Sequence, residues 1–312
     1  MPQGRSYGTS LVLYIFAMPR LHVLFALPFW ASIVSAAIKS SEDNSTINIS
    51  NDRLSFAVAK SSGSVSKLSL DGQNLLGTGR GPYLDVQWDG FWAPGSGANY
   101  QLFTGTDRAN KSYAGAVMSQ DKAGKILEQY WFLRDGETGL HVFSRAKYSN
   151  STIPSGGDLG EMRQLFRPTA SVWTHLSSSA DMYAPLPDLS GAPVVQDATW
   201  YVGNKTGDPY VQQMSDYFTK YMFSEEWRDL KVHGMYGDGS KSSDGTTYGA
   251  WLLMTTKDTY FNGPTHSDLT VDGIVYNYLI SNHHGNGVPE TLNGFDRTFG
   301  PVCELFPLQE TS

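Results

Sequence analysis

The stretch Ile126-Leu-Glu-Gln-Tyr-Trp-Phe-Leu133, with the following Arg134-Asp-Gly-Glu-Thr-Gly139 and Leu140-His-Val-Phe-Ser-Arg-Ala-Lys-Tyr148, decides the fold class. Two aromatic-rich runs flank a short segment with two glycines, which is typical of a β-hairpin. Further strand candidates are residues 54–58, 65–70, 161–166, 197–202, 215–223, 247–256 and 269–280. Helical periodicity is weak throughout. The sequence therefore predicts an all-β protein, a large antiparallel β-sandwich.

The composition agrees with a β-rich globular protein. The 312 residues include 32 glycines, and 13% are aromatic while only 17% are charged. Such a mix fits many strands joined by tight turns better than a helical bundle. The formal net charge is −7 and there is no basic run, so nucleic acid is excluded as an expected partner.

Residues 1–36 are expected to be a targeting segment outside the fold. Met18-Pro-Arg20 is a short basic stub, residues 21–34 are mostly apolar, and Val34-Ser35-Ala36 offers a small-residue cleavage site. This pattern predicts a secretory signal peptide, with Met18 as the biological start and residues 1–17 as an N-terminal extension. The alternative is a signal anchor, because residues 11–17 add a second apolar patch, but Arg20 interrupts the two patches. We expect a secreted, extracellular protein without membrane attachment after cleavage.

Glycosylation signals and cysteine content support that compartment. Five sequons occur, at Asn44, Asn48, Asn110, Asn150 and Asn204. The single cysteine, Cys303, rules out an internal disulfide and offers no metal site. We therefore expect a glycoprotein that needs no metal or other cofactor and is stabilised by the size of its core.

Two basic elements suit the binding and deprotonation of an acidic sugar. Arg163 and Arg167 are four residues apart, so they share one face of a strand, and guanidinium groups bind carboxylates bidentately. Their alternative is pairing with local acids such as Glu161. Lys220 lies in an aromatic strand candidate, where desolvation and nearby guanidinium groups would lower its pKa toward that of a neutral base. Its alternative is a solvent-facing lysine on an edge strand.

The stretch Tyr276-Asn-Tyr278-Leu-Ile-Ser-Asn-His283 places two tyrosines on one strand face, with an imidazole beyond the strand end. The alternative is that these tyrosines only pack the sheet. His266, in a turn before this strand, could orient a substrate or bond to Asp268. Together with the arginines and the lysine, these groups predict β-elimination beside a carboxylate. The arginines would neutralise the carboxylate, the lysine would remove the proton and a histidine would protonate the leaving oxygen.

Segments in order between residues 40 and 300 are similar to the catalytic domain of fungal rhamnogalacturonate lyases, polysaccharide lyase family 4, and most closely to the B-type enzyme. They include Gly81-Pro-Tyr-Leu-Asp85, Gly160-Glu-Met-Arg-Gln-Leu-Phe-Arg-Pro168, Ser215-Asp-Tyr-Phe-Thr-Lys-Tyr221 and Val275-Tyr-Asn-Tyr278. The resemblance implies a galactose-mutarotase-like β-sandwich. It also implies site roles: Lys220 as catalytic base, His283 as acid with His284 as the alternative, Arg163 and Arg167 on the galacturonate carboxylate, and Tyr276, Tyr278 and His266 in the groove.

The resemblance further implies the substrate and the domain organisation. The substrate would be rhamnogalacturonan I, cleaved in its rhamnose–galacturonate backbone to leave a 4,5-unsaturated galacturonate, and we expect a monomer. Family members continue into a fibronectin-III-like domain and a jelly-roll carbohydrate-binding domain, both missing here. We therefore expect residues 37–300 to form the lyase sandwich and residues 301–312 to be a divergent tail without strand alternation, as in a truncated product.

Two other functions remain open on the residues alone. A non-catalytic carbohydrate-binding sandwich could use Trp88 and Trp92 as stacking platforms, although core packing explains them equally well. A glycoside hydrolase needs two carboxylates in one groove. Candidates for these carboxylates are Asp229, Asp238, Asp268 and Asp296, and none of them forms an obvious pair in the sequence.

Overall fold

The computed structural model describes residues 38–178, 183–196, 199–203, 205, 216–219, 232–254, 268–271, 273–282, 287–306 and 308–309. The chain divides into the compact units Met1–Val34 and Ser35–Ser312, and every described residue belongs to the second. The expected signal peptide lies outside the described residues. Within the described ranges, no helix has the length and apolar character needed to cross a bilayer.

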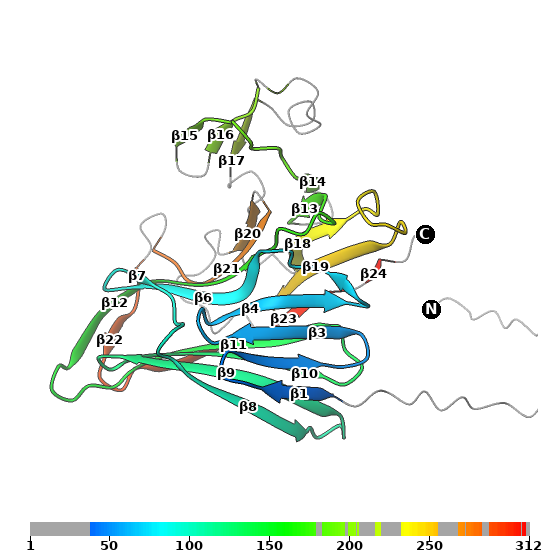
Figure 1. The fold of residues 1–312 in the computed structure, drawn as a ribbon. Coiled ribbons are helices and arrows are strands. Elements are labelled where there is room, and N and C mark those ends of the chain that lie inside the picture. Colours follow the sequence, from blue (N-terminus) through cyan, green and yellow to red (C-terminus); the bar gives the residue numbers. More distant parts are fainter. Residues whose placement is uncertain are drawn as a thin grey trace, which may run out of the picture. The chain divides into compact units, whose positions relative to one another are not determined.

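The first sheet is antiparallel and has eleven strands (Figure 1). Its path is β1 (Lys39–Glu42), β2 (Thr46–Ser50), β3 (Leu54–Ala59), β4 (Ser64–Leu70), β6 (Arg80–Trp88), β12 (Ser155–Arg167), β21 (Ile274–Ile280) and β20 (Asp268–Val271). Beside this path, β5 (Gln73–Asn74) pairs with β4, β7 (Phe91–Trp92) with β6, and β22 (Glu290–Leu292) with β12.

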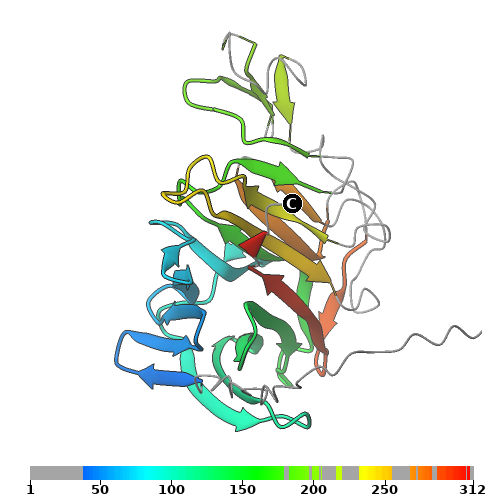
Figure 2. The same cartoon turned by 90° about the vertical axis from the view of Figure 1, so that its right-hand side faces the viewer.

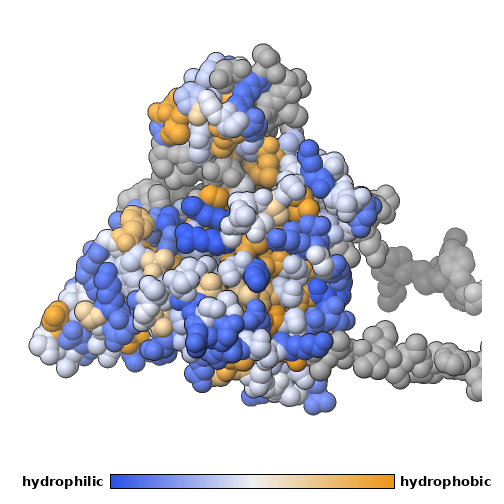
Figure 3. Space-filling model, in the orientation of Figure 1, coloured by the Kyte–Doolittle hydropathy of each residue, from blue (hydrophilic) through white to orange (hydrophobic). Residues whose placement is uncertain are grey.

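The second sheet is also antiparallel and has ten strands. Its path is β14 (Tyr183–Pro185), β13 (His175–Ser177), β18 (Val232–Gly237), β19 (Thr247–Met254), β23 (Asp296–Leu305), β11 (Gly139–Tyr148), β10 (Lys125–Arg134), β9 (Ser112–Lys122) and β8 (Asn99–Thr106), with β24 (Leu308–Gln309) beside β19. A third sheet joins β15 (Val194–Gln196), β16 (Thr199–Tyr201) and β17 (Tyr217–Thr219). Figure 3 shows an apolar patch over β15, where Val194 and Val195 are exposed.

The core forms between the two large sheets because their strands alternate in burial. Along β10, buried and half-buried residues alternate over all ten positions, so one face is apolar and the other is accessible. Trp131 on that strand is fully buried, and its indole N–H donates to the carbonyl of Pro82 on β6, at 3.2 Å. This bond ties the two sheets together. The prediction of an all-β, antiparallel sandwich is confirmed, as is the hairpin formed by β10 and β11.

Two sequence-based expectations about strands are wrong. Residues 269–280 form a hairpin of β20 and β21, which turns at Gly273 with a φ of +79°. The segment after Pro301 does keep the strand alternation, with Val302, Glu304 and Phe306 buried. Residues 301–305 belong to β23, which is paired with β11 on one side and β19 on the other (Figure 2).

A buried polar chain crosses the core between the sheets. The Asn277 amide donates to Gln164 at 3.0 Å, Gln164 donates to the Ser144 hydroxyl at 2.7 Å, and Ser144 donates to Gln129 at 2.6 Å. Nearby, Glu304 lines a small cavity of about 10 Å³ together with Gln164 and Asn277. That volume has room for about one water molecule. Burial raises the pKa of Glu304 to about 8, so the carboxyl is mostly protonated at neutral pH.

Candidate functional site

Arg163 lies on the outer face of the first sheet, where β6, β12 and β21 pair. The register places it opposite Asp85 on β6 and Tyr278 on β21. Asp85 accepts two hydrogen bonds from the guanidinium, at 2.8 Å from Nε and 2.9 Å from Nη2. The guanidinium carbon is 5.9 Å from the ring centre of Tyr278 and 5.5 Å from that of Phe91. The bidentate pair fixes the plane of the guanidinium, and both rings are within the range of cation–π contact.

The electrostatics of Arg163 keep it charged. Burial lowers the pKa of Arg163, but the hydrogen bonds and negative charge of Asp85 outweigh burial, and the pKa is raised above its usual value. The Glu161 carboxylate is also close, with its Oε2 atom 3.5 Å from Nη1 of Arg163. The alternative of pairing with local acids is therefore realised, through Asp85 as well as Glu161. A substrate carboxylate would meet a guanidinium that is already oriented by protein.

Arg167 lies further along β12 and is exposed. The register places it opposite Arg80 on β6, and the Arg80 guanidinium carbon lies 4.0 Å from the ring centre of Tyr83. Among the described residues, neither Arg80 nor Arg167 makes an ion pair. This end of the face therefore has two arginines on adjacent strands, with no acidic partner among the described residues, and positive charge of this kind attracts anions.

Of the two predicted groove tyrosines, the structure describes the side chain of Tyr278 but not that of Tyr276. Tyr278 is only 4% exposed and packs in a small buried cluster with Phe218 of β17 and Leu176 of β13. Of Tyr276 only the backbone is described, opposite Leu165 of β12. Tyr278 therefore packs against neighbouring strands while its ring faces Arg163.

The remaining predicted site residues lie outside the described part of the chain. These are Lys220, His266, His283 and His284. Lys220 follows β17 directly in the sequence, and His283 comes three residues after β21. The roles of base and acid stay predictions.

Asp85 is the site residue that sequence reasoning missed, although the alternation of β6 contained a signal. Leu84 and Val86 are buried in the core, which puts Asp85 on the opposite, outer face of a central strand. A carboxylate at such a position needs a partner. Its partner is 78 residues away in the sequence, so local pattern could not identify Arg163.

Trp88 does not act as a stacking platform. It is fully buried, and its indole N–H donates to the Gly156 carbonyl at 3.1 Å and to the Thr291 hydroxyl at 3.2 Å. The Trp92 indole N–H, in turn, donates to the Trp88 carbonyl at 3.2 Å. Core packing therefore accounts for Trp88, and Trp92 packs partly against the same core.

Two of the four carboxylates considered for a hydrolase have described side chains. Asp296 is bound by Arg145 on the second sheet, and Asp238 accepts hydrogen bonds from Ser240. Asp229 and the side chain of Asp268 lie outside the described residues. Across the described ranges, no group of three or more His, Cys, Asp or Glu side chains could hold a metal ion.

The sequons lie in different settings. Asn44 and Asn110 are exposed in turns between strands, whereas Asn48 is half-buried on β2 and Asn150 is half-buried after β11. Asn204 lies outside the described residues. Glycosylation at these positions stays a prediction.

Comparisons with known proteins bear on the resemblance noted in the sequence. The family described as "Probable rhamnogalacturonate lyase B middle domain" matches residues 172–266. "Probable rhamnogalacturonate lyase B" of Aspergillus flavus is 56% identical over 289 residues, which cover 88% of this chain and 43% of that protein. "Rhamnogalacturonate lyase B" of Emericella nidulans is 53% identical over 300 residues, which cover 92% of this chain and 45% of that protein. The chain thus spans less than half the length of these curated relatives.

These matches confirm the resemblance to the B-type lyases. Among solved structures, an Enterococcus faecalis protein described as belonging to glycosyl hydrolase family 38 has a TM-score of 0.42 at 9% identity. That match covers 84% of this chain and 30% of the other chain. The score is too low to establish a shared fold.

Proposed function

This chain is related to the fungal rhamnogalacturonate lyases along about nine-tenths of its length, and on that premise we propose that it is a pectin-degrading lyase. Its substrate would be rhamnogalacturonan I, and its reaction an internal β-elimination in the rhamnose–galacturonate backbone. The 56% identity to the Aspergillus flavus protein is the observation that carries the substrate class. Arg163 and Arg167 on β12 add the positive charge that binding of a galacturonate carboxylate requires.

The proposed reaction breaks two bonds on one galacturonate. Lys220, unprotonated, removes the C5 proton, and the C5–H electrons form the C4=C5 double bond while the C4–O4 bond breaks. His283 gives a proton to the departing O4 oxygen, and the new end is a 4,5-unsaturated galacturonate. The step needs positive charge at the C5 carboxylate, because negative charge accumulates there as the proton leaves. Arg163 and Arg167 are proposed to supply it.

The described residues favour different roles for Arg163 and Arg167 in binding the carboxylate. Arg167, exposed beside Arg80, is suited to attract and bind the carboxylate. Arg163 is held by Asp85, so its geometry is set before substrate binds, which lowers the ordering cost of binding. In this proposal the ring of Tyr278 packs against the guanidinium of Arg163. Tyr276 and His266 contact the sugar chain.

The same proposal includes the cellular setting. We infer a secreted glycoprotein acting on plant cell-wall pectin as a monomer, with the signal peptide removed and without a cofactor. The catalytic unit would begin at residue 37 and would include the whole of β23, which ends at Leu305. The curated relatives are longer than the region that this chain matches. We therefore propose that further domains also have a role in the whole protein.

The test is an elimination assay with rhamnogalacturonan, followed by ultraviolet absorbance of the conjugated product. We expect absorbance to rise with the parent protein and Lys220→Ala to slow the rate by about 100-fold or more, the range for loss of a general base. Lys111→Ala, at an exposed turn, is the matched control and should keep the parental rate. New reducing ends without absorbance would indicate a hydrolase. Retention of the polysaccharide with neither signal would indicate a non-catalytic carbohydrate-binding sandwich.

A further inference from the structure

The outer face of the second sheet carries four half-buried aromatic rings, here called the aromatic strip: Tyr113, Tyr130, Phe132 and Phe143. The rings of Tyr130 and Phe132 on β10 are nearly parallel, at 15°, with centres 6.3 Å apart. Tyr113 of β9 and Phe143 of β11 stand almost at right angles to Phe132, with centres at 6.0 and 6.2 Å. The strip thus has two parallel ring planes and two rings set edge-on beside them.

The orientation of Phe132 depends on a glycine in the neighbouring strand. Gly115 of β9 lies opposite Phe132 in the register. A Cβ atom on Gly115 would lie 2.1 Å from the Phe132 ring, closer than any van der Waals contact. The ring therefore occupies the space that any other residue would fill. Phe132 thus packs directly on the backbone of the neighbouring strand.

One end of the strip opens into a hollow of about 460 Å³, which is within the usual volume range of small-molecule sites. Its lining residues are Tyr130, Phe132, Phe143, Arg145, Asp296 and Thr298. Arg145 donates to both oxygens of Asp296, at 2.7 and 2.5 Å, and to Glu128 at 3.1 Å. The Tyr130 hydroxyl also donates to Glu128, at 2.5 Å. Lys147, opposite Asp296 in the register, adds a second positive charge to this end.

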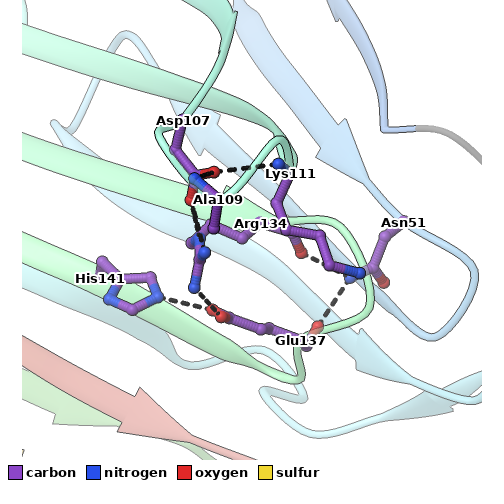
Figure 4. Close-up of polar contacts among 7 residues, drawn as sticks. All are labelled: Asn51, Asp107, Ala109, Lys111, Arg134, Glu137 and His141. Carbon is purple, nitrogen blue, oxygen red and sulfur yellow. Dashed lines mark hydrogen bonds and ion pairs between the residues drawn. The ribbon is translucent and has the colours of Figure 1, made fainter.

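The other end of the strip has a matching arrangement (Figure 4). Arg134, opposite Tyr113 in the register, donates from Nε to Asp107 at 2.9 Å and also pairs with Glu137. The Glu137 carboxylate reaches His141 at 2.6 Å. Each end of the strip therefore has an arginine held between two carboxylates.

This arrangement gives no preference to acidic sugars. The arginine at each end already binds two carboxylates, whereas the face around Arg163 also has Arg80 and Arg167, which make no ion pair among the described residues. The carboxylate and hydroxyl oxygens still have lone pairs that can accept from sugar hydroxyls. The parallel ring faces, which carry partial negative charge, can pack against the C–H face of a pyranose. We propose that the aromatic strip and its hollow form a second glycan-binding surface, for uncharged pyranose residues of a polysaccharide.

The surface lies on the other sheet from Arg163 and does not require the proposed elimination activity. It is tested by affinity electrophoresis of the secreted protein in gels containing neutral β-1,4-galactan. We expect galactan to retard the parent, and both Phe132→Ala and Tyr130→Ala to weaken binding on the order of tenfold. Phe91→Ala, an exposed aromatic on β7 of the first sheet, is the matched control and should bind galactan like the parent. Thermal unfolding of each variant verifies that it is folded.

Several outcomes would overturn the proposal. Migration of the parent unchanged by galactan would do so, as would two folded strip variants that bind like the parent. Loss of binding in Phe91→Ala alone would assign galactan to the face around Arg163. A parent dimer in sedimentation that Phe132→Ala dissociates would show that the strip joins two copies of this chain. Galactan binding without any elimination product would leave this inference standing and would remove only the proposed lyase activity.

Discussion

Glu304 should make the stability of this protein depend on pH, and replacing it with glutamine should remove that dependence. The carboxyl is 5% exposed on the core face of β23. It faces a cavity whose other lining residues come from β12, β19 and β21 and from Phe306, and none of these residues is charged. Burial raises its pKa from 4.5 to about 8. The folded state therefore keeps a proton that the unfolded state loses.

The sign and size follow from that difference. Below pH 4.5 Glu304 is protonated in both the folded and the unfolded state, so it causes no loss in the free energy of unfolding. As pH rises from 4.5 to 8, the unfolded state is favoured by about 1.4 kcal/mol per pH unit, because it alone ionises. The loss is about 3 kcal/mol at pH 7 and reaches about 5 kcal/mol above pH 8. This is a large part of the 5–15 kcal/mol or so that stabilises a typical domain.

Urea unfolding followed by tryptophan fluorescence at pH 5, 6, 7 and 8 measures the effect. Glu304→Gln has nearly the same shape, cannot ionise, and should be more stable than the parent by about 3 kcal/mol at pH 7 and similar to it near pH 5. Glu290→Gln removes an exposed carboxylate and should follow the pH profile of the parent. A difference between parent and Glu304→Gln that stays constant from pH 5 to 8 would refute the reasoning.

Three further substitutions test the packing and the candidate site. Trp131→Ala removes a fully buried ring and its bond to Pro82, and should lower the free energy of unfolding by about 3–5 kcal/mol; a loss below about 1 kcal/mol in urea melts would contradict the sandwich packing. Ser144→Ala interrupts the polar chain across the core and should lower the free energy of unfolding by about 1–3 kcal/mol. An unchanged urea midpoint would contradict this prediction. Asp85→Ala should cost about 2 kcal/mol through lost hydrogen bonds to a charged group, and should raise KM for rhamnogalacturonan if Arg163 contacts the substrate, whereas parental kinetics would assign the pair to stability alone.

The parts of the fold that were predicted correctly are those whose signals are local. The β10–β11 hairpin is an example, because two alternating aromatic strands and their turn lie within 24 residues, 125–148. The pattern of residues 269–280 predicts one strand where the structure has the β20–β21 hairpin, although Asp272-Gly273 is a strong turn signal. Its short first strand, Asp268–Val271, and the apolar residues on both sides hid the turn.

The strand after Pro301 is hidden in the sequence for a different physical reason. Its inward positions are Val302, Glu304 and Phe306, and a carboxylate in the middle of that series breaks the apolar pattern on which strand prediction depends. Only the tertiary setting, an uncharged cavity that keeps Glu304 protonated, makes this series a core face. The Asp85–Arg163 pair cannot be predicted from local sequence, because the order of the strands in the sheet brings together residues that are 78 positions apart.

The position of β23 has a consequence for how the second sheet assembles. The hairpin strands β8 to β11 form one block, and β13, β14, β18 and β19 form another, while β23 is the strand through which the two blocks are hydrogen-bonded. Its contacts with β11 span about 150 residues, as the Arg145–Asp296 pair shows. Closing so long a loop is entropically slow. We therefore expect the two blocks to have open edges until β23 docks, and we expect unpaired edges in that interval to favour aggregation of the folding chain.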